Sequence, residues 1–576
     1  MRGSRFHSTF LCLCVLCGLL FAAFAATAPH GAAAATGPTL SVNAAASRHP
    51  ISPFIYGMNF ADQSLAQELR LPVRRWGGNT TTRYNWQNDM SNHASDYYYE
   101  NIPEDNPDAS DLPNGSAADR FIEQDRATGT QTLLTIPLIG WVPKQRKSDH
   151  PYDCGFPKTR FSSQQSFDMY DPNCGDGYHT NGSPITGNDP LDTSVAIGPT
   201  FIQGWMQHLI GRYGTAAQGG VQFYNLDNEP GLWHETHRDV HPAHPSYNEL
   251  RDLGYQYAAA IKATDPDALV LGPVQDGWAR YFYASYTDNP DPVAQADRDN
   301  HGGTPFVEWY LQQMQAYDDQ HQTRLLDYFD LHYYPQADAV SLAPAGNAQT
   351  QALRLRTTRS LWDPSYVDES WIADTETGNM AVQLIPRMRD WVNQNYPGTK
   401  LAISEYNWGA LDDMNGALAQ ADVLGIFGRE ALDLATLWEP PSASDPGAFA
   451  FRIYRNYNGV GGSFGETSVS ASSSDQGQLA IYAAVRAIDN TLTLVVVNKS
   501  TSALTSQVNL AGFTPAAGAQ VYRYSAADTQ HIVRQADQGV SASGFSAAFP
   551  ASSITLVVMP PAQALVPRAF MPLIER

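Results

Sequence analysis

The strongest constraint on the fold is an alternation that repeats eight times between about residues 50 and 457. Short runs rich in β-branched and aromatic residues alternate there with segments of helical spacing. The eight runs are 54–59, 72–76, 132–138, 221–226, 269–273, 328–334, 400–405 and 432–438. Eight strands with helices between them are the count of a (β/α)8 barrel. The sequence therefore predicts an α/β fold whose main domain, residues 50–457, is a TIM barrel. One helix start is well marked, because Ser246 and Glu249 have the spacing of a capping box.

The character of the sequence changes near residue 459. All twelve tryptophans lie between Trp76 and Trp438, and Gly/Ser-rich turns then separate alternating segments at 479–486, 491–498 and 552–559. This pattern is typical of an antiparallel β-sandwich. We predict a second, smaller β-sandwich domain over residues 459–565, joined by a strand within residues 37–49. Because it lacks tryptophan, we expect this domain to support the barrel rather than to bind glycans.

The first residues have the pattern of an export signal. Arg2 and Arg5 precede an apolar run from residue 10 to residue 24, and small residues follow. We predict a signal peptide over residues 1–28, with cleavage as late as about residue 35, and hence a secreted protein. No later apolar stretch reaches the roughly 20 residues that a membrane span needs.

Three of the five cysteines lie in this signal segment, which leaves Cys154 and Cys174. An even pair outside the cytosol predicts one disulfide bond. Both residues lie in Gly/Pro/Asp-rich loop sequence, although two separate buried thiols remain the alternative.

The charge of the chain limits its partners. There are 58 acidic against 36 basic residues, a formal net charge of −22. Nucleic acids and anionic membranes are held mainly by basic side chains, so neither is an expected partner. A neutral polymer is compatible with this charge, and aromatic residues, at 11%, suit stacking on its sugars. We expect the protein to be a monomer.

Two glutamates stand where a barrel places its catalytic groups, at the carboxyl ends of strands. Glu229 follows the predicted fourth strand in Asp-Asn-Glu-Pro, and Glu405 ends the predicted seventh strand in Ser-Glu-Tyr-Asn. Two carboxyl groups facing each other across the barrel mouth are what glycoside hydrolysis requires. The alternative is that each glutamate only caps a helix or holds a loop.

The chain resembles glycoside hydrolase family 44 along nearly all of its length after the signal segment. The residues that carry the resemblance are Ile-Ser-Pro-Phe-Ile-Tyr-Gly at 51–57, Arg-Trp-Gly-Gly-Asn at 75–79, Arg-Tyr-Asn-Trp at 83–86, Asp-Asn-Glu-Pro at 227–230 with Leu-Trp at 232–233, and Ser-Glu-Tyr-Asn at 404–407. The resemblance implies a (β/α)8 barrel with a β-sandwich and a retaining endo-β-1,4-glucanase that often accepts xyloglucan. It also implies that Glu229 is the acid/base and Glu405 the nucleophile, with no cofactor required for the chemistry.

Further residues fit that chemistry. Arg75 is expected near the nucleophile, where a cation keeps a carboxylate ionised, although a structural salt bridge is the alternative. Asn228 suits a sugar hydroxyl, by the resemblance the 2-OH, unless it is a buried amide that ties two loops. Tyr334 is preferred over Tyr333 as a hydrogen-bond donor to the nucleophile. His332, on the same strand, is expected to be a core imidazole.

Endo-action on a polymer needs aromatic rings along a cleft. The positions after the predicted strands place four tryptophans at the mouth as cleft walls, although core packing is the alternative for each: Trp141, Trp233, Trp408 and Trp438. Trp76, in the motif of the second strand, is a further substrate-binding candidate.

Two clusters could bind metal, and no ligand set can be assigned from the sequence. The histidines 234, 237, 241 and 244 have no cysteine partner and no His-Glu-x-x-His context, so a solvated loop is favoured over zinc. The acidic run Glu104, Asp105, Asp108 and Asp111 could hold a structural calcium ion through its oxygens, and the resemblance supports a calcium site.

The sequence thus predicts a secreted retaining endo-β-1,4-glucanase that hydrolyses cellulose-like β-glucans, xyloglucan or both by double displacement. Another retaining glycosidase, an arabinofuranosidase, a xylanase or a mannanase, is the nearest rival. In some arabinofuranosidases the acid/base glutamate is followed by methionine, whereas Glu229 is followed by Pro230. A non-catalytic glycan-binding protein is the rival of a different class, and the presence of both glutamates argues against it.

Overall fold

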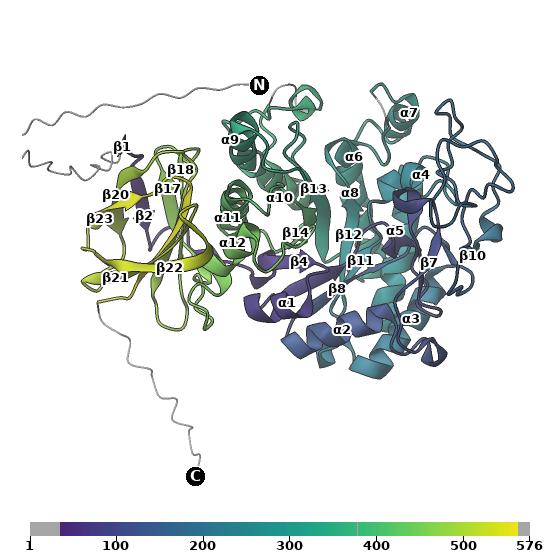
Figure 1. Ribbon diagram of the computed structural model, residues 1–576, viewed down its shortest axis with the longest axis horizontal. Helices are drawn as coiled ribbons and strands as arrows, with labels where there is room; N and C mark the ends of the chain where they lie inside the picture. Colours follow the sequence, from purple (N-terminus) through teal and green to yellow (C-terminus); the bar gives the residue numbers. More distant parts are fainter. Residues whose placement is uncertain (1–34, 288, 377, 379, 563–576) are drawn as a thin grey trace, which may run out of the picture.

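The computed structural model describes residues 35–562, apart from residues 288, 377 and 379. A barrel surrounded by helices lies beside a smaller domain of two β-sheets (Figure 1). The segment predicted to be a signal peptide, residues 1–28, lies outside the described residues.

Eight parallel strands close into a barrel, which confirms the predicted fold class. In chain order they are β4 (Gly57–Asn59), β5 (Val73–Trp76), β8 (Gln131–Ile136), β11 (Phe223–Leu226), β12 (Leu269–Gln275), β13 (Tyr328–Tyr333), β14 (Lys400–Tyr406) and β15 (Leu434–Leu437). The pairing of β15 with β4 completes the circle.

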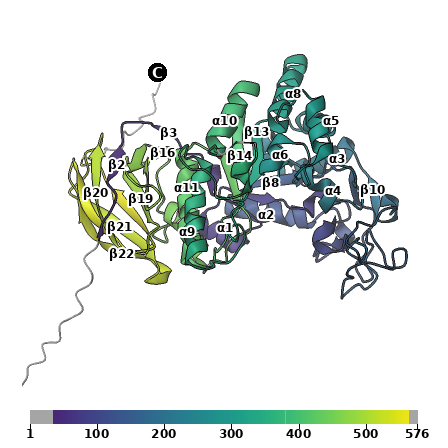
Figure 2. The same cartoon turned by 90° about the horizontal axis from the view of Figure 1, so that it is seen from above.

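Helices cover the outside of the barrel (Figures 1 and 2). The longer ones are α1 (Gln63–Leu69), α2 (Ala117–Thr128), α3 (Pro199–Tyr213), α5 (Tyr247–Thr264), α7 (Pro292–Asn300), α8 (Phe306–His321), α9 (Ala348–Thr357), α10 (Leu384–Asn395), α11 (Met414–Arg429) and α12 (Pro446–Arg455). Two short helices, α4 (Trp233–Thr236) and α6 (Trp278–Phe282), lie in the loops after β11 and β12. The capping box predicted for Ser246 and Glu249 is confirmed at the start of α5.

The side chains inside the barrel form layers, because every second residue of a strand points inward. An apolar layer at the amino-terminal half consists of Val73, Leu133, Phe223, Leu271, Tyr328, Ala402 and Leu434. Residues two positions later on a strand share its face. They form a second, mostly polar layer of Arg75, Thr135, Asn225, Asp330, Ser404 and Thr436, all fully buried. The lower layer therefore closes the barrel, and the upper layer supports the mouth above it.

The second domain is a sandwich of two sheets. The smaller sheet contains β1 (Ala35–Thr36), β2 (Leu40–Asn43), β17 (Ser470–Ser473), β20 (Leu504–Ala511) and β23 (Gly544–Phe549). The larger contains β3 (His49–Pro50), β16 (Thr467–Ser468), β18 (Leu479–Val485), β19 (Leu492–Asn498), β21 (Gly518–Ser525), β22 (Asp528–Gly539) and β24 (Ser553–Met559). Strand β2 precedes the barrel in the chain, yet it pairs with β20 and β17.

The sandwich is fixed to the barrel through helix α11. Asp422 of that helix is buried, and it pairs with Lys499 at 2.5 Å and accepts a hydrogen bond from the Tyr482 hydroxyl at 2.7 Å. Gly425 lies under the Tyr482 ring, where an added Cβ would come within 2.2 Å of a ring carbon. This close approach packs α11 against the sheet.

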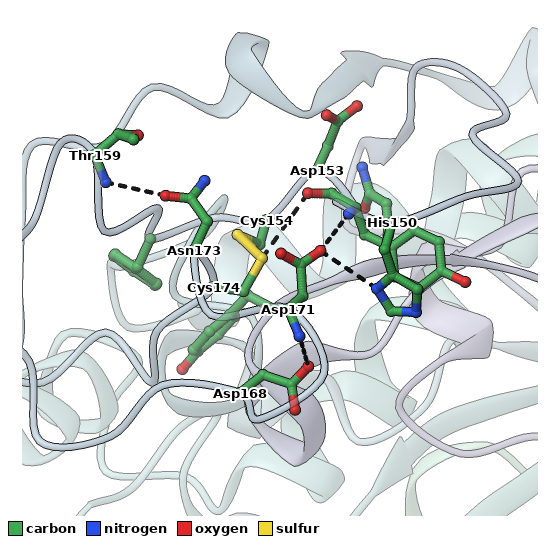
Figure 3. Close-up of a disulfide and its surroundings, with 12 residues drawn as sticks. His150, Asp153, Cys154, Thr159, Asp168, Asp171, Asn173 and Cys174 are labelled. Atoms are coloured by element: carbon green, nitrogen blue, oxygen red, sulfur yellow. Dashed lines mark hydrogen bonds and ion pairs between the residues drawn. A yellow bond between two sulfur atoms is a disulfide. The ribbon is translucent and has the colours of Figure 1, made fainter.

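A long loop between β8 and α3 carries the short strands β9 (Trp141–Pro143) and β10 (Ser194–Ala196). It also contains a disulfide bond between Cys154 and Cys174, as predicted, with the two Cα atoms 5.7 Å apart (Figure 3). None of the helices in the described part of the chain combines the length and apolarity that crossing a membrane requires.

Candidate active site

Glu229 and Glu405 lie at the mouth of the barrel on different strands. Glu405 is near the end of β14, and Glu229 lies three residues beyond β11. The backbone of Glu229 is left-handed, with φ of 48°, which is uncommon for a residue other than glycine. Its N–H donates to the carbonyl of Val274 at 3.1 Å, which fixes the loop against the next strand.

Asp227 anchors the same loop from below. Its carboxylate accepts hydrogen bonds from the Leu138 N–H at 2.5 Å, the Ile139 N–H at 3.2 Å and the Thr82 hydroxyl at 2.5 Å. These contacts join the loops after three neighbouring strands. The position of Glu229 is therefore set by the barrel and not by its own loop alone.

The two carboxyl groups are close together. One carboxylate oxygen of Glu229, one of Glu405 and a ring nitrogen of His332 all lie within 4.8 Å of one another. Retaining glycosidases hold their carboxyl groups about 5–5.5 Å apart, and inverting ones about 6.5–9.5 Å apart to seat a water. The short separation favours direct attack by one carboxylate.

Glu405 has the environment of an anion. Arg75, fully buried, donates from Nη1 to Oε1 at 2.6 Å, and the Tyr334 hydroxyl donates to Oε2 at 2.8 Å. Both oxygens thus face donors that stabilise negative charge. Tyr334 makes the contact that the sequence analysis expected, whereas the Tyr333 ring lies beside Trp408.

Arg75 is held by three buried amide side chains. It donates to Asn225 at 2.9 Å, to Asn59 at 3.2 Å and to Asn228 at 2.9 Å. Gly77 leaves room for it, because a Cβ at that position would lie 2.3 Å from the guanidinium carbon. This close approach explains why a glycine follows Arg75-Trp76.

Asn228 ties two loops together. Its oxygen also accepts from the Gly78 N–H at 3.2 Å, and its Nδ2 donates to Asn79 at 3.1 Å. Within the described part of the chain this is the one acceptor of Nδ2, so its second hydrogen remains for a ligand. A role for Asn228 toward a sugar hydroxyl stays a prediction.

Glu229 has the environment of an acid. Burial and the nearby Asp276 raise the pKa of Glu229 to about 8, against the opposing effects of Arg75 and Arg280. The carboxyl group is therefore protonated at neutral pH. Its Oε1 lies 2.9 Å from Nδ1 of His332.

His332 was expected to be a core imidazole, but it lies between the two carboxyl groups. Its Nδ1 is 3.4 Å from Glu405, and its Nε2 is 3.2 Å from the Ser404 hydroxyl. Ser404 gives its only hydroxyl hydrogen to Asp330 at 2.7 Å, so Nε2 must be the donor in the contact with Ser404. Burial lowers the pKa of His332, so the ring is neutral and Nδ1 accepts the proton of Glu229.

The sequence contained a signal for this arrangement. Asp330, His332 and Tyr334 are two residues apart at the end of β13, and such residues share one face of a strand. Because Asp330 and Tyr334 face the barrel interior, His332 must do so too.

The pH dependence follows from the pKa of Glu229. The acid must be protonated, so we expect kcat/KM to be maintained below pH 8 and to fall as the pH rises through about 8. Asp276→Asn removes a charge that raises this pKa and frees Arg280, which lowers it, so the alkaline limb should move down by about one unit. Asp252→Asn, at an exposed position of α5, is the control that should not move it. If the alkaline fall of kcat/KM stays at the same pH in Asp276→Asn, the assignment of Glu229 as the acid would be contradicted.

Two of the predicted cleft tryptophans are buried, which corrects the sequence analysis. Trp233 and Trp408 are 0% and 1% exposed. The Trp408 indole N–H donates to Thr357 at 3.1 Å, because residues 406 and 408 alternate with Glu405 and point toward the helices. Trp76 is also buried, and its ring packs behind Phe60.

Phe60 was missed by the sequence analysis. It follows β4 at the barrel mouth, is 39% exposed and has a left-handed backbone with φ of 46°. Its ring centroid lies 6.2 Å from that of Trp438, which is half-buried. Trp141 is half-buried too. Of the tryptophans predicted to line the cleft, Trp438 and Trp141 are therefore left to contact sugars, together with Phe60.

The two predicted metal clusters differ from expectation. His237 is fully buried and His234 is 9% exposed, so the histidines do not form a solvated loop. Within the described residues, neither they nor the acidic run, whose Asp105, Asp108 and Asp111 are exposed, form a group of three metal-ligating atoms.

A different acidic cluster lies beside the disulfide. Glu100, Asp168 and Asp171 are 0%, 3% and 2% exposed. Among the described residues, no N–H or hydroxyl donor reaches either carboxylate oxygen of Glu100. Burial and the two aspartates raise the pKa of Glu100 to about 8. Asp171 and Asp168 lie directly below the disulfide in Figure 3.

Comparisons with known proteins agree with this geometry. A family model described as glycoside hydrolase family 44 matches residues 90–337. The solved structure of CelM2, a bifunctional glucanase-xylanase protein from a metagenome library, is 42% identical, with a TM-score of 0.85 over 91% of this chain and 99% of that one. The xyloglucanase of Paenibacillus polymyxa from family 44 is 31% identical, with a TM-score of 0.75 over 91% of this chain and 100% of that one.

Endoglucanase A of Paenibacillus lautus is 32% identical over 480 residues, which are 81% of this chain. The chain spans 64% of the length of that relative and 36% of the β-mannanase/endoglucanase A of Caldicellulosiruptor saccharolyticus, to which it is 30% identical over 84% of its own length.

Proposed function

The chain belongs to glycoside hydrolase family 44, and we propose that it is a retaining endo-β-1,4-glucanase that hydrolyses cellulose-like β-glucans and xyloglucan. The observation that carries the proposal is the pair of carboxyl groups within 4.8 Å, one facing Arg75 and Tyr334 and the other protonated.

The first step breaks the glycosidic bond. Glu405 attacks the anomeric carbon, and Glu229 gives its proton to the leaving oxygen, so one glucan chain departs with a new hydroxyl group. The other chain is left as an α-linked ester of Glu405. As charge leaves Glu405, the hydrogen bond from Tyr334 and the pairing with Arg75 weaken at the ester and return in the second step.

The second step releases the product. Glu229, now a carboxylate, takes a proton from water, whose oxygen attacks the anomeric carbon from the face opposite to Glu405. The bond to Glu405 breaks, and the product regains the β configuration. His332 prepares the first step, because its neutral Nδ1 accepts the proton of Glu229 and keeps that carboxyl group in one orientation before the transfer.

The alternative functions, another retaining glycosidase or a non-catalytic glycan-binding protein, imply other substrate preferences. One experiment distinguishes them from the proposal. Initial rates of reducing-end release would be measured on carboxymethylcellulose, mixed-linkage glucan, xyloglucan, xylan and mannan. The proposal expects the highest kcat/KM on the β-glucans, and faster hydrolysis of xylan or mannan would replace it with one of the rivals. Release of no reducing ends from any of the five would support the non-catalytic rival.

We also propose export of the protein as a monomer. The Cys154–Cys174 disulfide is of a kind that persists in oxidising compartments, and the pattern at residues 1–28 is that of a signal peptide.

The buried carboxylates beside the disulfide suit a structural calcium ion, because oxygens of Glu100 and Asp171 lie within 4.8 Å of each other. Ionised Glu100 is costly without a cation, which is why burial and the two aspartates raise its pKa, and hard divalent ions prefer carboxylate oxygens. The third group near Glu100 and Asp171 is Cys174, whose sulfur is committed to the disulfide. Glu100 and Asp171 are the residues that would hold the ion, which would fix the disulfide loop and supply no step of the reaction.

Calcium should therefore raise the stability of the protein. At 100 times its Kd, an ion that binds only the folded state adds about 2.7 kcal/mol, which calorimetry in calcium and in EDTA would detect as a shift of Tm. Glu100→Gln should abolish most of that shift, and Glu123→Gln, an exposed position on α2, should retain it. Equal Tm values in calcium and EDTA would refute the site.

A further inference from the structure

A hollow of about 330 Å³ opens at the carboxyl end of the barrel, between the loops that follow β13, β14 and β15. We call it the side pocket. Its lining includes Leu342 and Pro344 after β13, Asn407 and Asp412 after β14, and Glu439 and Ser442 after β15. Its volume is at the small end of the range of about 300–1,000 Å³ typical of ligand pockets.

A buried arginine fixes two walls of the side pocket. Arg354 is 0% exposed, and it donates to the carbonyl of Trp408 at 2.6 Å and to the carbonyl of Pro344 at 2.8 Å. It donates also to the carbonyls of Ala339, Ala343 and Ala345. One cation therefore joins the loop after β13 to the loop after β14, and the pocket is formed before any ligand binds.

The contact between these loops requires a glycine. Gly409 has a positive φ of 76°, and a Cβ there would lie 2.3 Å from the carbonyl oxygen of Val340. The third wall is tied in as well, because Asn407 donates to the carbonyl of Trp438 and the Gly447 N–H donates to Leu411 at 2.8 Å.

The lining suits a neutral sugar. Leu342, 56% exposed, and Pro344 offer apolar surface to the C–H face of a ring. Asp412 and Glu439 are exposed carboxylates, which accept hydrogen bonds from hydroxyl groups. Their like charge opposes a uronic acid or any other anion.

The location indicates which sugar this is. In the proposed mechanism the sugar is bonded to Glu405, and Asn407 of the side pocket is two residues further along the chain. Glu439 is next to Trp438, one of the rings left to contact sugars. Glu405 and Trp438 are not part of the lining, so a main chain held by them lies outside the side pocket, and we assign a sugar inside it to a branch.

We propose that the side pocket binds a neutral side-chain sugar of a decorated β-glucan, such as the xylosyl branch of xyloglucan. This inference rests on the proposed function, and it assigns a residue-level cause to acceptance of branched substrates. Ser442, Asp412 and Glu439 then determine which branch is accepted, and they take no part in bond cleavage.

The test is the ratio of kcat/KM on xyloglucan to kcat/KM on unbranched mixed-linkage glucan. Ser442→Trp places a large ring at an exposed position of the lining and should lower this ratio about tenfold. Ile488→Trp, at a 90% exposed position of the sandwich, is the control for an added surface ring and should leave the ratio unchanged. Tm would be recorded for both variants.

A second variant tests the charge of the lining without adding volume to it. Asp412→Asn combined with Glu439→Gln preserves shape and removes charge, so KM for xyloglucan should rise about threefold or more and the penalty against a glucuronic acid branch should shrink. If neither variant changes the ratio, or if kcat/KM falls equally for both substrates, the side pocket is not a branch site. If the unaltered protein releases reducing ends from neither glucan, the proposed function fails instead.

Discussion

Glu405→Ala should lower the hydrolysis of β-glucan by a factor on the order of 10⁶, the size of loss found when the nucleophile of a two-step hydrolase is removed. The reason is specific to this site, because within the described residues the other carboxyl group beside the anomeric position is Glu229, which is protonated at neutral pH. Initial rates on polymer and on an activated aryl β-glucoside would measure the loss.

Azide should restore turnover of the aryl glucoside by this variant. The small anion fits the space left by the side chain beside Arg75 and attacks from the face that Glu405 used, so the product is the α-glycosyl azide. Glu405→Gln is the matched control, because its amide fills that space and should block rescue. Production of the β-azide, or rescue of the glutamine variant, would contradict the role of Glu405.

The barrel and its acid pair were predictable because they depend on local periodicity. The strand pattern identified all eight barrel strands, and the two-residue period places Arg75, two positions after Val73, on an inward face. Glu405 departs from this period, because Ala402 and Ser404 already face inward and a register shift between Ile403 and Tyr406 turns the next side chain into the mouth. Tyr334 followed by the same rule, because it lies beyond Asp330 on one face of β13. Strand period was therefore sufficient for Arg75 and Tyr334, whereas Glu405 was predictable from its position at the end of the seventh strand.

The tryptophans show where that reasoning fails. Trp408 and Trp233 follow strands closely, as cleft residues do, yet Trp408 points toward the helices beyond the register shift in β14 and Trp233 is buried in α4. Phe60 is exposed because its left-handed backbone turns it toward the mouth. A left-handed phenylalanine has no sequence signature, so its position required the structure.

The acidic cluster beside the disulfide could not be predicted from the sequence for another reason. Glu100 is 68 and 71 positions before Asp168 and Asp171, and a long loop brings them together. The run of neighbouring acids at 104–111 looked more like a metal site because its members are adjacent in the sequence. Adjacency in a loop places charges in solvent, whereas a buried ligand set needs tertiary contacts.

Glu229→Gln tests the other half of the mechanism. The amide keeps the size of the side chain and can still donate to Nδ1 of His332, so the geometry is retained while the transferable proton is lost. Hydrolysis of polymer should fall about 10²–10⁴-fold, because its leaving oxygen needs that proton. An aryl glucoside with an acidic phenol leaves without a proton, so its first step should be largely spared.

The second step then becomes limiting, because no base activates water. The ester of Glu405 should accumulate, giving a burst of phenol equal to the enzyme concentration and a labelled Glu405 peptide in mass spectrometry. Azide needs no base, and it should attack this ester from the open face to give the β-glycosyl azide, the opposite anomer to that from Glu405→Ala. Proton NMR of the two azides distinguishes the roles. If the two anomers are exchanged between the variants, Glu229 and Glu405 have been assigned the wrong way round. If both variants give the same anomer, the two residues do not act as a retaining pair.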